Sequence, residues 1–331
     1  MTSENKKKNT GLFKKLTSAS AFGSVLIVAV MVIIMLIIKN DYLAPQNILV
    51  LSKVLAVTAA IGFSQLVVMA CGAMNLSIGN IGALAAVIAG WAMTNAGVHW
   101  GVGILLGILT GIIAGVINGF LVYRAGGVGV AGFLTTLATM SLYQGIMLTI
   151  TQGKPFYGPD GKFEKAFLAV GNTKILGLPS SLWITIVIAI ILAIMYSKLS
   201  IGRQMLAFGA NYKAAELYGV SKFKVVMVSN ILSGVLASIA GILAMIRIEA
   251  AQPGMGKDWM LMSFAAPLIG GSRNEGGKVS MFGAVVGALA ITIIENALVH
   301  LRVDVYWNEL IYGLVIIFAI ALDRVRNIKK K

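Results

Sequence analysis

The uncharged stretch GVGILLGILTGIIAGVINGFLVY occupies residues 101–123. About 20 consecutive apolar residues are enough to cross the hydrocarbon core of a bilayer as an α-helix. The stretch does not alternate between polar and apolar residues, as a strand of a membrane β-barrel would. It therefore predicts a transmembrane helix, since helices and closed barrels are the structures that satisfy every backbone group in lipid.

Comparable apolar runs occur along nearly the whole chain. Hydrophobic residues make up 58% of the 331 residues and charged residues 12%, whereas a soluble domain carries about 25% charged residues. The sequence therefore predicts an all-α polytopic membrane protein with about ten transmembrane helices. They are expected at 21–38, 48–71, 76–95, 101–123, 130–151, 181–198, 224–246, 259–272, 279–300 and 305–322.

The 27 Lys and Arg residues are distributed unevenly over the loops between these runs. If the N-terminus is cytoplasmic, about two thirds of them lie on the cytoplasmic side, as the positive-inside rule favours. Ten crossings then leave both termini in the cytoplasm of a bacterium, with the bundle in its inner (plasma) membrane. We expect a basic tail at 1–20, one transmembrane domain at 21–322 and a second basic tail at 323–331.

Several functional classes are disfavoured by composition. The net charge of +15 could suggest nucleic acid, but a nucleic-acid reader would gather its charges on one soluble face. Cys71 is the one cysteine, so an internal disulfide is excluded. No His/Cys cluster has metal-ligand spacing, and no nucleophile–base pair or carboxylate pair suggests a membrane-embedded enzyme. We therefore expect no catalytic residue, no metal, no bound cofactor and no nucleic-acid partner.

Glycine recurs every four residues in the run 101–123. Such a stripe lets a second helix approach backbone to backbone. Static helix packing is the favoured interpretation, and a sliding or gating contact is the alternative. The residues concerned are Gly107, Gly111, Gly115 and Gly119.

Polar side chains inside the predicted spans are candidates for a solute path. Intramembrane polar groups face the bundle interior or a watery route, although a single Ser or Thr more often bonds a neighbouring helix. Lys53 and Glu295 lie near the outer ends of their runs, and a mid-membrane ionisable relay for a proton-coupled carrier is not found. The candidate path residues are Asn75, Ser77, Thr135, Thr136, Thr139 and Asn296.

Two loops and one span stand out. The cytoplasmic loop 199–223 contains Asn211, a good N-cap, and Gly219, which is placed to end a short helix. Such a helix could dock in a groove on a soluble partner or serve as an ordinary connector. The external loop 152–180 is long enough for a small outward-facing element, and the Pro267-containing run 259–272 is expected to be short or broken.

With these motifs in place, the chain resembles the permease subunits of ribose/galactose-type ABC importers. Their loop pattern G-x-N-x-x-A-A-x-x-x-G is matched at 209–219, and NLSIG at 75–79 is similar to their D-L-S-V-G. FLTTLAT at 133–139, the glycine-rich 270–277 and the stretch 306–323 are also similar to family patterns. Asn75 in place of the usual acid, Ala131-Gly132 in place of prolines and Ala138 in place of glycine are departures.

The resemblance implies an importer in which this chain is a non-catalytic subunit. It implies a second permease copy, as a homodimer or a paralogous heterodimer, an ATPase on the cytoplasmic side and an external solute-binding protein. The chain lacks a G-x-x-x-x-G-K-[ST] stretch, so ATP would be bound by the ATPase. The residues expected to couple to the ATPase are Gly209, Asn211, Ala214, Ala215, Glu216, Leu217 and Gly219.

The resemblance also implies a weakly binding path at the dimer centre for a sugar or sugar-like solute. Related permeases carry nucleosides, autoinducers or branched-chain amino acids, and these remain alternatives. A stand-alone secondary carrier or channel is a further alternative from a different class.

Overall fold

A computed structural model of the chain describes residues 19–127 and 129–304, with a few single positions between 307 and 317. Within these residues the fold is helical. Seven helices are long and apolar enough to cross a membrane. They are α3 (Pro45–Ala70), α4 (Ile78–Asn95), α5 (Trp100–Arg124), α6 (Val130–Thr151), α8 (Ser180–Lys198), α11 (Lys222–Ile248) and α13 (Met281–His300).

Two further apolar helices coincide with predicted spans. They are α2 (Ala19–Ile38) and α12 (Trp259–Ile269), and α12 is short, as expected, with Pro267 inside it. The prediction of a helical membrane bundle is confirmed. The tenth predicted span, 305–322, lies largely outside the described residues, as do most of the tail 1–20 and all of the tail 323–331.

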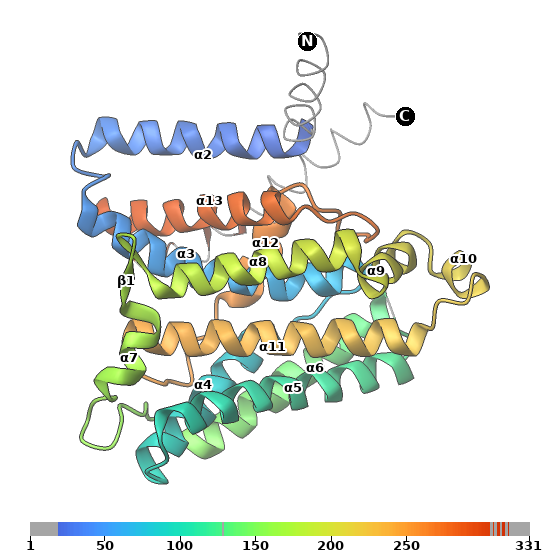
Figure 1. The fold of residues 1–331 in the computed structure, drawn as a ribbon, viewed down its shortest axis with the longest axis horizontal. Coiled ribbons are helices and arrows are strands. Elements are labelled where there is room, and N and C mark those ends of the chain that lie inside the picture. Colours follow the sequence, from blue (N-terminus) through green and yellow to red (C-terminus); the bar gives the residue numbers. More distant parts are fainter. Residues whose placement is uncertain are drawn as a thin grey trace, which may run out of the picture.

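The long helices run roughly along one direction in stacked layers (Figure 1). Helix α3 is the central element, because α8, α11, α12 and α13 all pack on it. Its second half is buried on all sides. Helices α4 and α5 lie against α11, and α2 lies on α13. A helix that is apolar all round, like α3, belongs inside a bundle rather than on its surface.

The two ends of the bundle carry different small elements (Figure 1). At one end are α9 (Ser200–Ala210) and α10 (Tyr212–Leu217). At the opposite end the loop 152–180 forms α7 (Lys165–Asn172) and an antiparallel pair, β1 (Lys174–Ile175) and β2 (Leu178–Pro179). An isolated bridge between Phe156 and Ala251 ties this loop to the link before α12. The loops predicted to face opposite sides of the membrane thus lie at opposite ends.

Two local features differ from the sequence expectation. Helix α9 was not predicted, since the only helix expected in the loop 199–223 begins after Asn211. Gly202 and Gly209 of α9 lie against neighbouring backbone, at Met195 and Ala70. Helix α3 begins at Pro45 rather than 48, since proline is well suited to a first helical turn.

Candidate functional site

A hydrogen-bond network crosses the centre of the bundle, starting at Asn75 in the link between α3 and α4. The Asn75 side-chain oxygen accepts from the Ser77 backbone N–H at 3.0 Å and from the Ser77 hydroxyl at 2.7 Å. Its amide donates to the Ser233 hydroxyl of α11 at 3.2 Å, and Ser233 pairs with Ser64 of α3 at 3.0 Å. All four side chains are fully buried. The network therefore fixes the start of α4 between α3 and α11.

The same network reaches α5 and α6. The Asn118 amide of α5 donates to the Ser77 hydroxyl at 2.7 Å, and the Tyr143 hydroxyl of α6 donates to Asn118 at 2.9 Å. Thr136 of α6 accepts from the backbone N–H of Leu76 at 3.3 Å. Tyr143 and Asn118 were not among the predicted site residues. A tyrosine in an apolar run could have been flagged, because a buried phenol usually finds a partner.

An asparagine suits position 75 because it both accepts and donates. A carboxylate could accept from Ser77 in the same way, but when ionised it has no hydrogen to offer Ser233. Because the side chain lies in a water-excluded centre, an ionised acid here would also need a countercharge. As an amide, Asn75 accepts from Ser77 and donates to Ser233 without placing a charge in this buried centre.

The other predicted path residues of α6 face differently. Thr139 is buried and its hydroxyl donates to the Thr136 carbonyl of its own helix. Thr135 is half-buried and donates to the Ala131 carbonyl at 2.7 Å. Back-bonding of this kind satisfies a threonine inside a membrane helix without a partner helix. Thr136 joins the network around Asn75, whereas Thr135 lies toward the exposed side of α6.

Asn296 lies in a separate polar cluster, near the end of the bundle that carries α7 and the β1–β2 pair. Its amide donates to the side-chain oxygen of Asn47 in α3 at 2.9 Å, and the Asn47 amide donates to the side-chain oxygen of Asn296 at 3.2 Å. Asn47 also donates to the carbonyl of Tyr42 at 2.7 Å, and the ring of Tyr42 packs edge-on against His300. Burial raises the pKa of the Tyr42 phenol above its usual value. The six predicted path residues therefore do not form one site.

The end formed by α9 and α10 presents a short capped helix. The Asn211 side chain accepts from the Ala214 backbone N–H at 3.1 Å, as expected of an N-cap. Gly219 follows at a φ of +82°, a left-handed value that a side chain would strain. At the tip, Leu217 is 89% exposed and Tyr218 is 90% exposed. Two large apolar side chains project beyond the bundle at this point.

The base of this end is held by close backbone contacts. A Cβ on Gly209 would meet the Ala70 carbonyl and the Gly277 nitrogen, and Gly277 itself donates to the Ala70 carbonyl at 3.2 Å. Ala215 is buried beneath the tip. Gly209, Ala70 and Gly277 thus bring α9, α3 and the link 270–280 together.

The sequence of most of this bundle matches a known permease family. The family described as "Branched-chain amino acid transport system / permease component" matches residues 45–320. The chain belongs to this permease family.

Curated relatives extend the likeness over nearly the full length of the permease. It is 36% identical to the ribose import permease protein of Bacillus subtilis over 300 residues, which cover 90% of this chain and 91% of the relative. It is 32% identical to the D-allose transport system permease protein of Escherichia coli, over 92% of this chain and 91% of the relative.

A solved ABC transporter of metal-chelate type, in an inward-facing conformation, has the same fold. The TM-score is 0.51 at 12% sequence identity, and the match covers 92% of this permease and 98% of that chain. At this identity the likeness concerns the fold alone.

The helix-packing glycines of the permease lie at helix contacts. A Cβ on Gly115 would meet the Asn230 carbonyl at 2.6 Å, and one on Gly107 would meet the Ala85 carbonyl at 3.0 Å. A Cβ on Gly119 would meet Met227 of α11. The stripe therefore lies in the seam between α5 and its neighbours α4 and α11.

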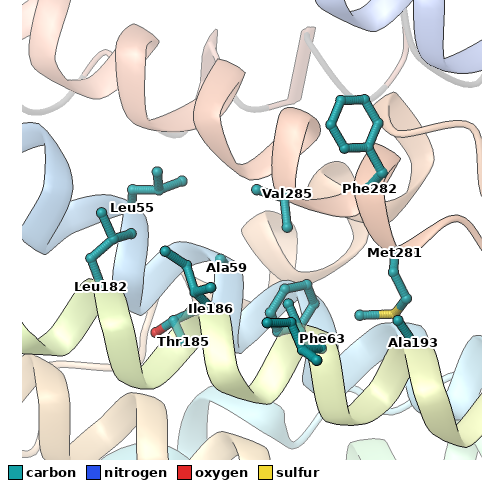
Figure 2. A pocket seen from close by; sticks show the side chains of 12 residues that line it. Leu55, Ala59, Phe63, Leu182, Thr185, Ile186, Ala193, Met281, Phe282 and Val285 are labelled. Atoms are coloured by element: carbon teal, nitrogen blue, oxygen red, sulfur yellow. The ribbon is translucent and has the colours of Figure 1, made fainter. Parts of the chain in front are cut away.

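An apolar cavity opens between α3, α8 and α13 of the permease (Figure 2). Figure 2 shows Phe63, Val285 and Phe282 around it, and its volume is about 310 Å³. Thr185 is the one hydroxyl in its lining, and it bonds to the Ala56 carbonyl at 3.1 Å. Such a lining offers no directional contact to a polar solute. Among the described residues, no group of three His, Cys, Asp or Glu side chains could hold a metal ion.

Proposed function

We propose that the protein is the membrane-spanning subunit of an ABC importer for a monosaccharide or a similar polyhydroxylated solute. The ribose and D-allose permeases align with more than nine tenths of their own length. This likeness favours a sugar over an amino acid as cargo, although the family as a whole is described by branched-chain amino acid transport. The bacterial inner membrane is the place of such a permease.

The single observation that carries the proposal is the exposed tip of α10. Leu217 and Tyr218 stand almost fully in solvent on a helix of six residues, capped by Asn211. Exposed large apolar side chains on a polar end mark a contact with another protein. An amphipathic helix laid into a groove is a common mode of such contacts. The groove would belong to the separate ATPase, which hydrolyses ATP on the cytoplasmic side.

The topology that goes with this function has ten spans and both termini in the cytoplasm. The end that carries α9 and α10 is also where α2 begins (Figure 1). The loop 152–180, at the opposite end, would face the external solute-binding protein. The domain limits of 21–322 for the bundle and 199–223 for the coupling loop are part of this proposal.

The solute path would lie between two permease copies, on the side where α6 is exposed. Of the seven full-length spans, α6 is the least buried, with 22% of its most apolar 18-residue stretch buried. Thr135 would border the path most closely. Asn75, Ser77, Thr136 and Thr139 would form its rigid wall.

Reconstitution in liposomes tests the proposal. With the cognate ATPase and binding protein, we expect ATP-dependent uptake of labelled D-ribose or D-allose, and no uptake by the permease alone. Uptake of L-leucine in place of both sugars would overturn the choice of cargo. Sugar uptake by the lone chain, driven by an ion gradient, would overturn the importer proposal and favour a secondary carrier.

A further inference from the structure

A second cavity, of about 350 Å³, lies between α3, the end of α11, α12 and α13. This volume is at the lower end of the roughly 300–1,000 Å³ of small-molecule pockets. Arg247, Asp258 and Glu295 contribute charged groups to the lining, Asn296 an amide, and Trp259 an aromatic side chain. The cavity therefore differs in chemistry from the apolar one between α3, α8 and α13.

The cavity lies at the end of the bundle that carries α7 and the β1–β2 pair. Arg247 is in the last turn of α11, and Asp258 immediately precedes α12. The link between them holds Ala251, which exchanges two backbone hydrogen bonds of 2.9 Å with Phe156 of the loop 152–180. In the proposed topology this end faces the outside of the cell.

The lining is matched to a neutral solute rich in hydroxyl groups. A guanidinium donates, carboxylates accept, and an amide does both, so each hydroxyl can find a partner. Asp258 and Glu295 already interact within the protein, which holds them in place. One formal positive and two formal negative charges disfavour an anionic solute. Trp259 supplies a fixed apolar wall, since it packs against Gly82 of α4.

Two orphaned polar groups lie inward of the cavity. Gln65 of α3 and Thr292 of α13 are fully buried, and neither the Gln65 amide nor the Thr292 hydroxyl has a partner among the described residues. Gln65 is four residues past the lining residue Ile61, and Thr292 is three before Glu295, so helical spacing puts both on the cavity-lining faces. A buried polar group left unpaired is destabilising, which points to a partner arriving through the cavity.

We propose that this cavity is a vestibule within each protomer that accepts one neutral, polyhydroxylated solute of monosaccharide size from the external side. Trp259 forms its wall, Arg247, Glu295 and Asn296 bind hydroxyl groups, and Gln65 and Thr292 are the next polar contacts inward. The inference rests on the proposed sugar import, but it concerns a place other than the dimer centre.

Protection of an introduced cysteine tests the vestibule on the isolated full-length permease. In a Cys71→Ala background, Val54→Cys places a thiol on the lining. We expect tens of millimolar D-ribose or D-allose to slow its reaction with a small methanethiosulfonate reagent at least threefold. Equal concentrations of L-leucine should have no effect. Leu176→Cys, in the exposed β1–β2 turn, is the control whose labelling no solute changes.

The lining variant Glu295→Gln keeps the side-chain shape and should abolish protection of Val54→Cys. Gln65→Leu removes the orphaned amide, so we expect an unchanged or raised melting temperature together with weakened protection. A lower melting temperature with full protection would show that Gln65 is structural and would contradict its role.

The outcomes separate this inference from the proposed function. No protection by either sugar overturns the vestibule, even if the complete transporter imports sugar. Protection of Val54→Cys without ATP-dependent uptake by the complete transporter supports the vestibule and overturns the importer proposal.

Discussion

The backbones of Gly111 and Gly234 touch where α5 crosses α11. A Cβ on Gly111 would collide with the Gly234 carbonyl oxygen, and a Cβ on Gly234 would collide with the Gly111 carbonyl oxygen. The contact is reciprocal, so neither residue can gain a side chain without moving a helix axis. Close approach of this kind is how membrane helices gain van der Waals contact without a hydrophobic driving force.

Gly111→Ala should destabilise the permease by about 1–3 kcal/mol, the usual cost of overfilling a tight interior. The added methyl group would also meet the Ser238 hydroxyl at 2.6 Å. The measurement is the melting temperature of the purified protein in detergent. Gly145→Ala is the matched control, because nothing lies within 4 Å of a Cβ at Gly145 in α6. Equal melting temperatures for the two variants would contradict a close contact between α5 and α11 at Gly111.

Leu217→Asp should prevent the ATPase from binding the permease. The side chain is 89% exposed, so the isolated permease should keep its melting temperature while an apolar docking contact is lost. Retention of the ATPase on immobilised permease measures this. Leu176→Asp is the control, because Leu176 is 86% exposed at the opposite end. Full ATPase retention by the Leu217 variant would rule out docking through this tip.

Gly219→Val should uncouple transport from ATP hydrolysis. The φ of +82° at Gly219 is strained for a β-branched residue, so the end of α10 must rearrange. We expect uptake in liposomes to fall at least tenfold, while hydrolysis by the free ATPase is unaffected. Replacing the buried Ala215 by Leu should act in the same direction. Uptake at the normal rate in both variants would contradict a lever role for α10.

Two cysteine variants test the sidedness of the bundle. In a Cys71→Ala background, Tyr218→Cys and Leu176→Cys place exposed thiols at opposite ends. A membrane-impermeant maleimide added to intact cells should label the Leu176 position and leave the Tyr218 position unlabelled until the cells are opened. The reverse pattern would invert the proposed topology.

Asn75→Leu should destabilise the bundle, because it removes the acceptor for both Ser77 groups and the donor to Ser233. Each buried polar group left unpaired costs about 1–3 kcal/mol. The readout is again the melting temperature in detergent. Thr149→Val removes an exposed hydroxyl that bonds its own helix, and it should leave the melting temperature unchanged. A stable Asn75→Leu variant would mean that the network contributes little.

The helices were predictable because each long apolar run must satisfy its backbone internally. The limits agree within a few residues for most runs, as for 130–151, which is α6. Helix α9 was missed because it is short and contains two weak helix formers, Gly202 and Gly209. Their absent side chains serve close contact with Met195 and Ala70 instead, which sequence alone does not distinguish from flexibility.

The polar sites were predictable only in part. Asn75, Ser77 and Thr136 were identified because polar groups in apolar runs are conspicuous, and the structure brings them together. Their partners Ser233 and Tyr143 come from helices distant in sequence, and no local pattern links them. The charged cavity was missed for the same reason, since its lining comes from four separate segments.

Helix α12 has 11 residues, so it rises about 16 Å in a hydrocarbon core about 30 Å thick. A count restricted to full-length spans leaves out both α2 and α12 and arrives at seven in the described residues. The parity of the crossings decides whether a segment emerges inside or outside, so omitting α12 reverses the side assigned to the link 270–280 and to everything after it. A half-length element thus determines the sidedness of the last part of the chain.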